Sequence, residues 1–255
     1  MSAFIAAFRF QLQLIRNDLD YLLDIATAPV YTVIFLSIVE HAGRPDLAVH
    51  AVLAPALITL WWQSLSTSGE VIDSDRWYGV LEPLVATPAS LYTVVLGRIS
   101  GVTMLSLFAF VESWVTARIL FGITVPVPHP WLFAVAIVVT GFAMSGTAAV
   151  MAGLFVRTRT ARTFQNSLSY PFFVLGGVIV PVALLPDWIE PLTRVVFLSW
   201  SADLLRDTLT TGPVVDPTVR LGIIFALGAV GALIGRKLID ALLDRVRALG
   251  TLSEV

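Results

Sequence analysis

The side chains best suited to acid–base and nucleophilic chemistry are His41, His50 and His129, together with Ser145 in the middle of an apolar segment. The histidines all fall at or near predicted loops between apolar segments. No apolar segment after Ser145 carries a histidine to act as its base. A serine in such a helix ordinarily packs against a neighbour or bonds back to the preceding turn. The pattern therefore predicts no nucleophilic enzyme.

Metal and nucleotide chemistry lack their sequence signals as well. The chain has no cysteine, no H-E-x-x-H motif and no cluster of Asp, Glu and His at metal-ligand spacing. It also lacks the G-x-x-x-x-G-K-[ST] loop that cradles nucleotide phosphates. The expectation is a chain that is not an enzyme, that holds no metal or other cofactor, and that cannot hydrolyse a nucleotide by itself.

Charged residues inside predicted apolar helices are the next candidates, because each costs roughly 2.5–3.5 kcal/mol at the bilayer centre. Asp24 and Arg98 lie within a few residues of predicted cytoplasmic ends, so their side chains are expected to reach the membrane surface. Glu112 lies about 21 Å beyond Arg98 on the same helix. Two interpretations of Glu112 stay open: it lines a pathway, with Trp61 and Trp62 nearby, or it is an interface residue.

The most informative stretch, residues 70–88, mixes charged, aromatic and aliphatic side chains between two apolar segments. Pro83 and Pro88 divide it into pieces, so it is expected to be a short amphipathic element that docks against another surface. From the residues alone, this element is either a docking site for a partner protein or a loop helix at the membrane surface.

The elements that must position these residues follow from composition. Of 255 residues, 57% are hydrophobic and 13% are charged, about half the charged fraction of a soluble domain. Mean hydropathy is +0.85, which indicates an all-α integral membrane protein. The formal charge is −2, because sixteen basic residues nearly balance eighteen acidic ones, so no nucleic-acid partner is expected.

Six apolar segments have lengths suited to membrane helices. They are predicted at residues 22–39, 48–68, 91–121, 131–155, 164–185 and 219–238. The third would form a helix near 45 Å against a hydrocarbon core near 30 Å, so it is expected to project from the membrane or to break. The fourth repeats small residues every four positions, Gly141, Ser145, Ala149 and Gly153, which predicts close helix packing.

Basic residues set the expected orientation, because cytoplasmic segments are enriched in them. With six spans and the N-terminus inside, eleven of the sixteen basic residues lie on the inner side. Both termini are therefore predicted to be cytoplasmic. The single transmembrane domain, residues 1–255, would include an amphipathic interfacial helix at 1–21, a cytoplasmic loop at 69–90 and one or two short outer-face helices within 186–217.

Two stretches resemble a known family. Residues 75–88, beginning Asp-Arg and continuing through Gly79 to Glu82 and Pro88, resemble the E-R-x-x-G-T-L-E-x-L-x-x-T-P signature of ABC-2 type export permeases. Residues 166–192 resemble that family's fifth span with its S-G-x-x-x-P and L-P-x-W elements, and residues 199–206 resemble the T-Y-A-x-E-A-x-R that follows. The sequence departs from the pattern at Val80, Gly176 and Phe197, and Asp203 replaces the glutamate.

The resemblance implies one half of an ATP-driven exporter. Its partners would be a separate ABC ATPase subunit in two copies, which would hold ATP and Mg²⁺, and a second permease chain, identical or related. The loop is similar to the family's coupling helix, and the candidate coupling residues are Glu70, Asp75, Arg76, Gly79, Val80, Leu81 and Glu82. The candidate subunit-interface or hinge positions are Pro29, Gly176, Gly177 and Pro181.

The resemblance also implies a location, and a predominantly apolar pathway with Trp61 and Trp62 nearby suggests a lipid-like or hydrophobic substrate. The chain would lie among the lipids of a bacterial inner or plasma membrane and export a lipid-like, drug-like or glycoconjugate substrate. The alternative function is an integral membrane scaffold that recruits a soluble partner and transports nothing.

Overall fold

The computed structural model describes the chain except residues 1, 18–25, 78–89, 156–160, 183–184 and 250–255. The described residues form helices and no strand. The elements are α1 (Ala3–Asn17), α3 (Thr27–His41), the 3₁₀ helix η1 (Pro45–Leu47), α4 (Ala48–Trp77), α6 (Leu91–Ser106), α7 (Phe108–Phe121), α8 (Pro130–Phe155), α9 (Ala161–Leu175), α10 (Glu190–Thr193), α11 (Phe197–Thr208) and α12 (Pro217–Leu249).

Four helical stretches in the described part of the chain are long and apolar enough to cross a membrane. They are Pro45–Gly69, Leu91–Phe121, Pro130–Phe155 and Pro217–Ala241. They match the second, third, fourth and sixth predicted spans. The helices at the first and fifth positions, α3 and α9, have 15 residues each, about 22 Å, which is short of the bilayer core.

The prediction of a helix through residue 185 was wrong, because α9 ends at Leu175. Gly177 adopts a left-handed conformation (φ +62°), and its N–H donates to the Val174 carbonyl in a turn that closes the helix. Pro181 follows and provides no N–H with which a helix could continue.

The third predicted span breaks, as its length indicated it would unless it projected from the membrane. Leu107 interrupts the helical run and separates α6 from α7. The hydroxyl groups of Thr103 and Ser106 donate to the carbonyls of Ile99 and Val102, four residues earlier. Such bonds compete with the backbone ladder and often bend helices.

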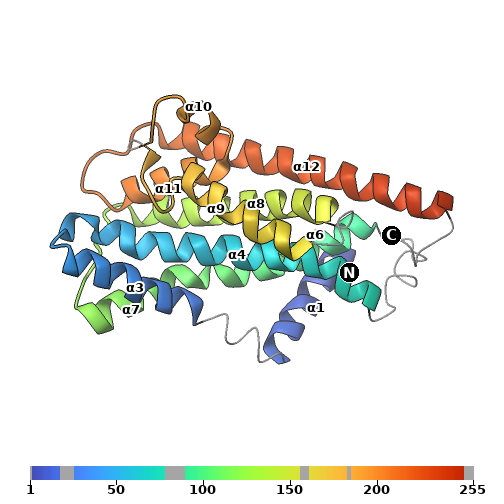
Figure 1. The fold of residues 1–255 in the computed structure, drawn as a ribbon, viewed down its shortest axis with the longest axis horizontal. Coiled ribbons are helices and arrows are strands. Elements are labelled where there is room, and N and C mark those ends of the chain that lie inside the picture. Colours follow the sequence, from blue (N-terminus) through green and yellow to red (C-terminus); the bar gives the residue numbers. More distant parts are fainter. Residues whose placement is uncertain (1, 18–25, 78–89, 156–160, 183–184, 250–255) are drawn as a thin grey trace.

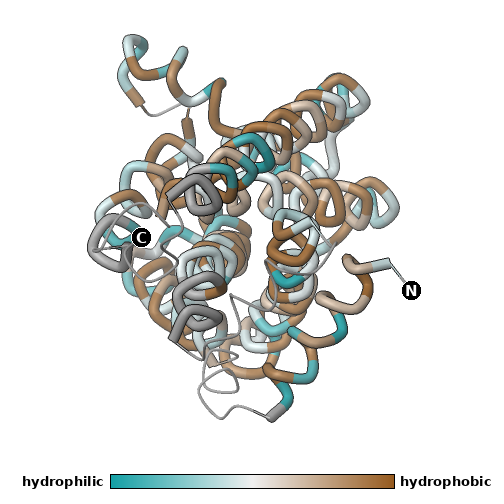
Figure 2. The backbone as a smooth tube through the Cα atoms, turned by 90° about the vertical axis from the view of Figure 1, so that its right-hand side faces the viewer, coloured by the Kyte–Doolittle hydropathy of each residue, from teal (hydrophilic) through white to brown (hydrophobic). Residues whose placement is uncertain are grey.

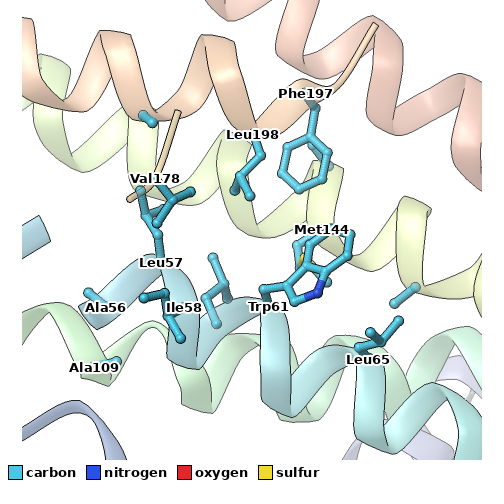
Figure 3. Packing of buried hydrophobic residues seen from close by; sticks show 14 of the residues in the cluster. Ala56, Leu57, Ile58, Trp61, Leu65, Ala109, Met144, Val178, Phe197 and Leu198 are labelled. Carbon is cyan, nitrogen blue, oxygen red and sulfur yellow. The ribbon is translucent and has the colours of Figure 1, made fainter. Parts of the chain in front are cut away.

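α4 occupies the centre of the bundle and contacts α3, α6, α7, α8, α9 and α11. Its inner residues, among them Leu57, Leu60 and Trp61, are fully buried. Figure 3 shows Trp61 within the main apolar cluster, with Met144 and Leu198 around it. Large apolar side chains are also exposed on the outer helices α3, α7 and α12, and Figure 2 shows apolar segments around the periphery of the bundle. This distribution is typical of helices that face lipid.

α8 and α12 pack closely through small residues. A Cβ atom at Gly146 would lie 2.1 Å from the Gly228 carbonyl oxygen, and one at Gly153 would lie 2.6 Å from Leu238. A Cβ atom at Gly235 would lie 2.6 Å from the Ala149 backbone. The close approach predicted from the fourth span is therefore confirmed at Ala149 and Gly153.

α1 forms a helix, as predicted for residues 1–21, and it packs against α6. Gly97 makes this possible, because a Cβ atom there would lie 2.7 Å from the Phe4 carbonyl oxygen. The expectation that Arg98 reaches the membrane surface was wrong. Arg98 is only 6% exposed, its Nε donates to Gln11 Oε1 at 2.9 Å, and its guanidinium lies 5.6 Å from the Phe10 ring centroid. The cause is α1, which covers the position.

Candidate functional site

The predicted coupling residues begin on α4. The helix continues past the apolar stretch that ends at Gly69, so Glu70, Asp75 and Arg76 lie on a charged extension about 12 Å long. The other coupling candidates, Gly79, Val80, Leu81 and Glu82, lie outside the described residues. α6 begins at Leu91, so the loop connects the ends of α4 and α6.

The start of α9 is tied to this end of α4. Gln165 is buried, and its Nε2 donates to the Leu65 carbonyl oxygen at 3.0 Å. Gly69 allows the contact, because a Cβ atom there would lie 2.0 Å from Gln165 Nε2. One helical turn later in α9, the Ser169 hydroxyl accepts a hydrogen bond from Trp61 Nε1 at 3.1 Å. α4 and α9 are thus joined by two hydrogen bonds in the buried interior.

The predicted pathway residues have three different environments. Trp61 is 0% exposed and stacks on Phe172, with ring centroids 4.6 Å apart, so it joins α4 to α9. Trp62, its neighbour, is 41% exposed. Glu112, on α7, is half-buried and lines a cavity of about 180 Å³ with Gln63 of α4.

The predicted hinge positions do not form one group. Pro29 lies in the first turn of α3, where the missing N–H breaks no helical hydrogen bond. Gly176, Gly177 and Pro181 lie together after α9. A Cβ atom at Gly176 would be 2.6 Å from the Phe172 carbonyl oxygen and 2.8 Å from Leu198 of α11, so a larger residue would displace α11 or the end of α9.

A charged hollow of about 490 Å³ adjoins this turn, and the predicted hinge residue Pro181 is part of its lining. It lies at the end of the bundle where α10 and α11 are found in Figure 1, opposite the end where α1 and the last turns of α12 lie. The lining residues are His50, Pro181, Val182, Leu185, Asp187, Glu190, Arg194, Asp203, Arg206, Asp207 and Arg220. His50 Nε2 and Arg206 Nε are buried without a hydrogen-bond partner among the described residues.

Arg206 connects the hollow to the turn after α9. Its Nη2 donates to the Gly177 carbonyl oxygen, and its Nη1 donates to Asp203 Oδ1 at 3.1 Å. Burial raises the pKa of the Asp203 carboxyl, an effect that Arg206 opposes, and burial lowers the pKa of the Arg206 guanidinium.

A second ion pair in the hollow joins α11 to α12, because Arg220 donates to Asp207. Asp203 and Arg206 fall in the stretch that resembles T-Y-A-x-E-A-x-R. This resemblance is the sequence feature that could have indicated them as functional residues. Their contact with Gly177 depends on chain folding and could not be found from spacing.

The described residues contain no group of three His, Cys, Asp or Glu side chains that could hold a metal ion. The arrangement offers a buried helical bundle, a charged extension at one end and a charged hollow at the other. The four membrane-length helices are the feature of a multi-pass membrane protein.

The family can now be stated. Residues 2–210 match the family model described as ABC-2 type transporter, so the chain belongs to that family and is the membrane subunit of such a transporter. Members of this family are permeases that lack ATPase activity of their own, which agrees with the expectation that this chain does not hydrolyse nucleotides by itself. Such permeases generally pair with an ATPase subunit.

A curated relative is Nodulation protein J of Neorhizobium galegae, which is 27% identical over 177 residues. The alignment covers 69% of this chain and 63% of that protein, so the chain spans less than two thirds of the relative's length.

Proposed function

We propose that this chain forms half of the export pathway of an ATP-driven transporter and couples to a separate ATPase subunit through residues 70–82. The proposal rests on the continuity of the helix α4. One continuous helix of 30 residues leads from His50, at the charged hollow, to the charged extension before the loop.

The buried contacts suggest how movement of the loop would travel. ATP and Mg²⁺ on the ATPase subunits would draw those subunits together and displace the loop and the end of α4. Gln165 and Ser169 would carry the displacement to α9. The turn at Gly176 and Gly177, bonded to Arg206, would then shift relative to α11. Because ligands act by favouring one state, ATP binding would favour an outward-open arrangement of these helices.

We infer an orientation with both termini cytoplasmic and the charged hollow on the outer side. We propose that α3 and α9 also cross the membrane, which would give six crossings in total. The basic residues support this, since most lie on the side of the loop at 69–90. An extracytoplasmic location for a reporter fused to the C-terminus would contradict the orientation.

We propose two such chains, identical or related, and two ATPase subunits in a bacterial inner or plasma membrane. Pro29, Gly176, Gly177 and Pro181 are proposed to act at the subunit interface or as hinges. The pathway would be lined by Glu112, which faces a cavity, and by Trp62, which is exposed at the surface. Trp61, the neighbour of Trp62, is buried in the core. The substrate would be lipid-like, drug-like or a glycoconjugate.

Co-purification with the candidate ATPase subunit tests the coupling role. Replacing Gly79, Leu81 and Glu82 together by alanine should abolish ATPase association and ATP-dependent transport. Asp46→Ala is the control, because this charge is exposed at the opposite end of α4. Normal association and transport by the triple variant would contradict the coupling assignment.

A further inference from the structure

The cavity beside Glu112 is built from four helices. Ile15 comes from α1, Thr59 and Gln63 from α4, Ser106 from α6, and Phe108 and Glu112 from α7. Its volume is about 180 Å³. Phe108 is 60% exposed, so the cavity reaches the surface of a helical stretch that is apolar enough to face lipid.

The polar atoms of this cavity are mostly hydrogen-bond acceptors. The single proton of the Ser106 hydroxyl lies between two acceptors, Gln63 Oε1 at 2.5 Å and the Val102 carbonyl oxygen at 2.8 Å, so the Ser106 oxygen can itself accept a hydrogen bond. Thr59 is 1% exposed, and its hydroxyl oxygen has no partner among the described residues. A buried hydroxyl without a partner is unfavourable and is rare in folded proteins.

Glu112 makes the cavity unusual. No hydrogen bond or ion pair joins its carboxylate to any described residue, although it lies within a membrane-length apolar stretch. An ionised carboxylate only accepts hydrogen bonds, and intramembrane ionisable residues ordinarily mark functional sites. The partner that the cavity lacks is therefore a cationic hydrogen-bond donor.

We propose that this cavity binds the primary ammonium group of an amphiphile that enters from the membrane. An ammonium group carries three N–H donors, and Glu112, Thr59 and Ser106 present oxygen atoms around one space. The aromatic ring of Phe108 at the opening favours a cation as well. Val102, Leu105 and Ala109 supply apolar walls for the attached chain. The inference rests on the proposed function, since it names the substrate class of the same export pathway.

Equilibrium binding to the full chain in lipid nanodiscs tests the proposal without requiring an ATPase. The probe is radiolabelled dodecylamine, with dodecanol and dodecyltrimethylammonium as competitors. We expect saturable binding at one site per chain, displaced by neither competitor at equal concentration. Glu112→Gln should weaken dodecylamine binding at least tenfold, and Thr59→Val should weaken it about threefold.

Matched variants separate the site from general effects. Glu40→Gln removes an exposed carboxylate from α3 and should leave binding unchanged. Size-exclusion chromatography verifies that each variant is folded and monodisperse. Unchanged dodecylamine binding by Glu112→Gln would overturn the proposal. If dodecanol displaces the probe equally well, binding does not depend on the positive charge, and the proposal is overturned. If dodecyltrimethylammonium displaces it equally well, binding does not depend on the three N–H donors, and the assignment to a primary ammonium group is overturned.

The outcome is independent of the coupling experiment. If the unaltered chain binds dodecylamine but does not associate with the candidate ATPase subunit, the export function is refuted and the binding site remains. ATP-dependent export by a chain that binds no amine would refute the site and leave the export function.

Discussion

Arg98 and Glu112 lie on the same apolar helical stretch, yet their surroundings are opposite. Arg98 is enclosed beneath α1, with Gln11 and Phe10 as partners. Glu112 faces a cavity and has no partner among the described residues. α1 supplies Gln11 and Phe10 to Arg98, whereas at the cavity beside Glu112 it contributes the apolar side chain of Ile15.

The comparison shows that a charge in a membrane helix can serve two purposes. A charge whose hydrogen bonds are made within the chain holds helices together. A charge whose hydrogen bonds are left open is available to a ligand. Arg206 on α11, outside the membrane-length stretches, is likewise bonded within the chain, to Gly177 and Asp203, although its Nε has no partner among the described residues. Substitutions at enclosed charges should therefore reduce stability, and substitution of Glu112 should not.

The largest loss is expected for Arg206→Met. The substitution removes the donor to Gly177 and leaves Asp203 partly buried without a cation. We expect unfolding free energy to fall by about 2–3 kcal/mol, below the range for a fully enclosed pair, because Asp203 is 32% exposed. Chemical denaturation in detergent micelles measures this. The control is Arg44→Met, which breaks an exposed pair and should change stability by less than about 1 kcal/mol.

Gly97→Val tests whether α1 is the cover that encloses Arg98. The added Cβ atom would lie 2.7 Å from the Phe4 carbonyl oxygen, so α1 must move away from α6. We expect a loss of about 2 kcal/mol and faster proteolysis within α1. Gly222→Ala is the matched control, because nothing lies within 4 Å of a Cβ atom there. Equal proteolysis of the two variants would show that α1 does not depend on this contact.

Arg98→Met tests the hydrogen bond beneath α1. The variant leaves the amide of Gln11 buried without its donor, so we expect a loss of about 1–2 kcal/mol in unfolding free energy. The double variant Gln11→Leu with Arg98→Met removes both polar partners and should recover most of that loss. Additive losses in this double-mutant cycle would mean that the two side chains do not interact.

The smallest change in stability is expected for Glu112→Gln. Because the carboxylate has no partner among the described residues, a neutral amide of similar shape should change unfolding free energy by less than about 0.5 kcal/mol or increase it. Denaturation in the same micelles, with Glu40→Gln beside it, provides the measurement. A loss as large as that of Arg98→Met would place Glu112 among the structural charges.

Several elements were predictable because their signals are local. Length and hydropathy predicted four of the long apolar helices, and the excess length of the third span left a break as one of two expected outcomes, without indicating its position at Leu107. The loop at 70–88 indicated the family before any fold was known, and the match over residues 2–210 confirmed the family.

Other features could not be predicted because they join residues distant in the chain. Hydropathy continued through residue 185, whereas α9 ends at a turn that depends on the backbone of Gly177 and on packing against Leu198. The bond from Arg206 to Gly177 crosses 29 positions, and that from Arg98 to Gln11 crosses 87. No periodicity in the sequence encodes these pairs.

The sequence by itself determined the class of protein. Apolar composition makes burial in a bilayer favourable whatever the packing, and a loop motif is contiguous, so both can be read without coordinates. Only the tertiary structure decided which charges are enclosed and which are open. That distinction depends on which helix covers each position, and helix packing brings together side chains that the chain itself keeps far apart.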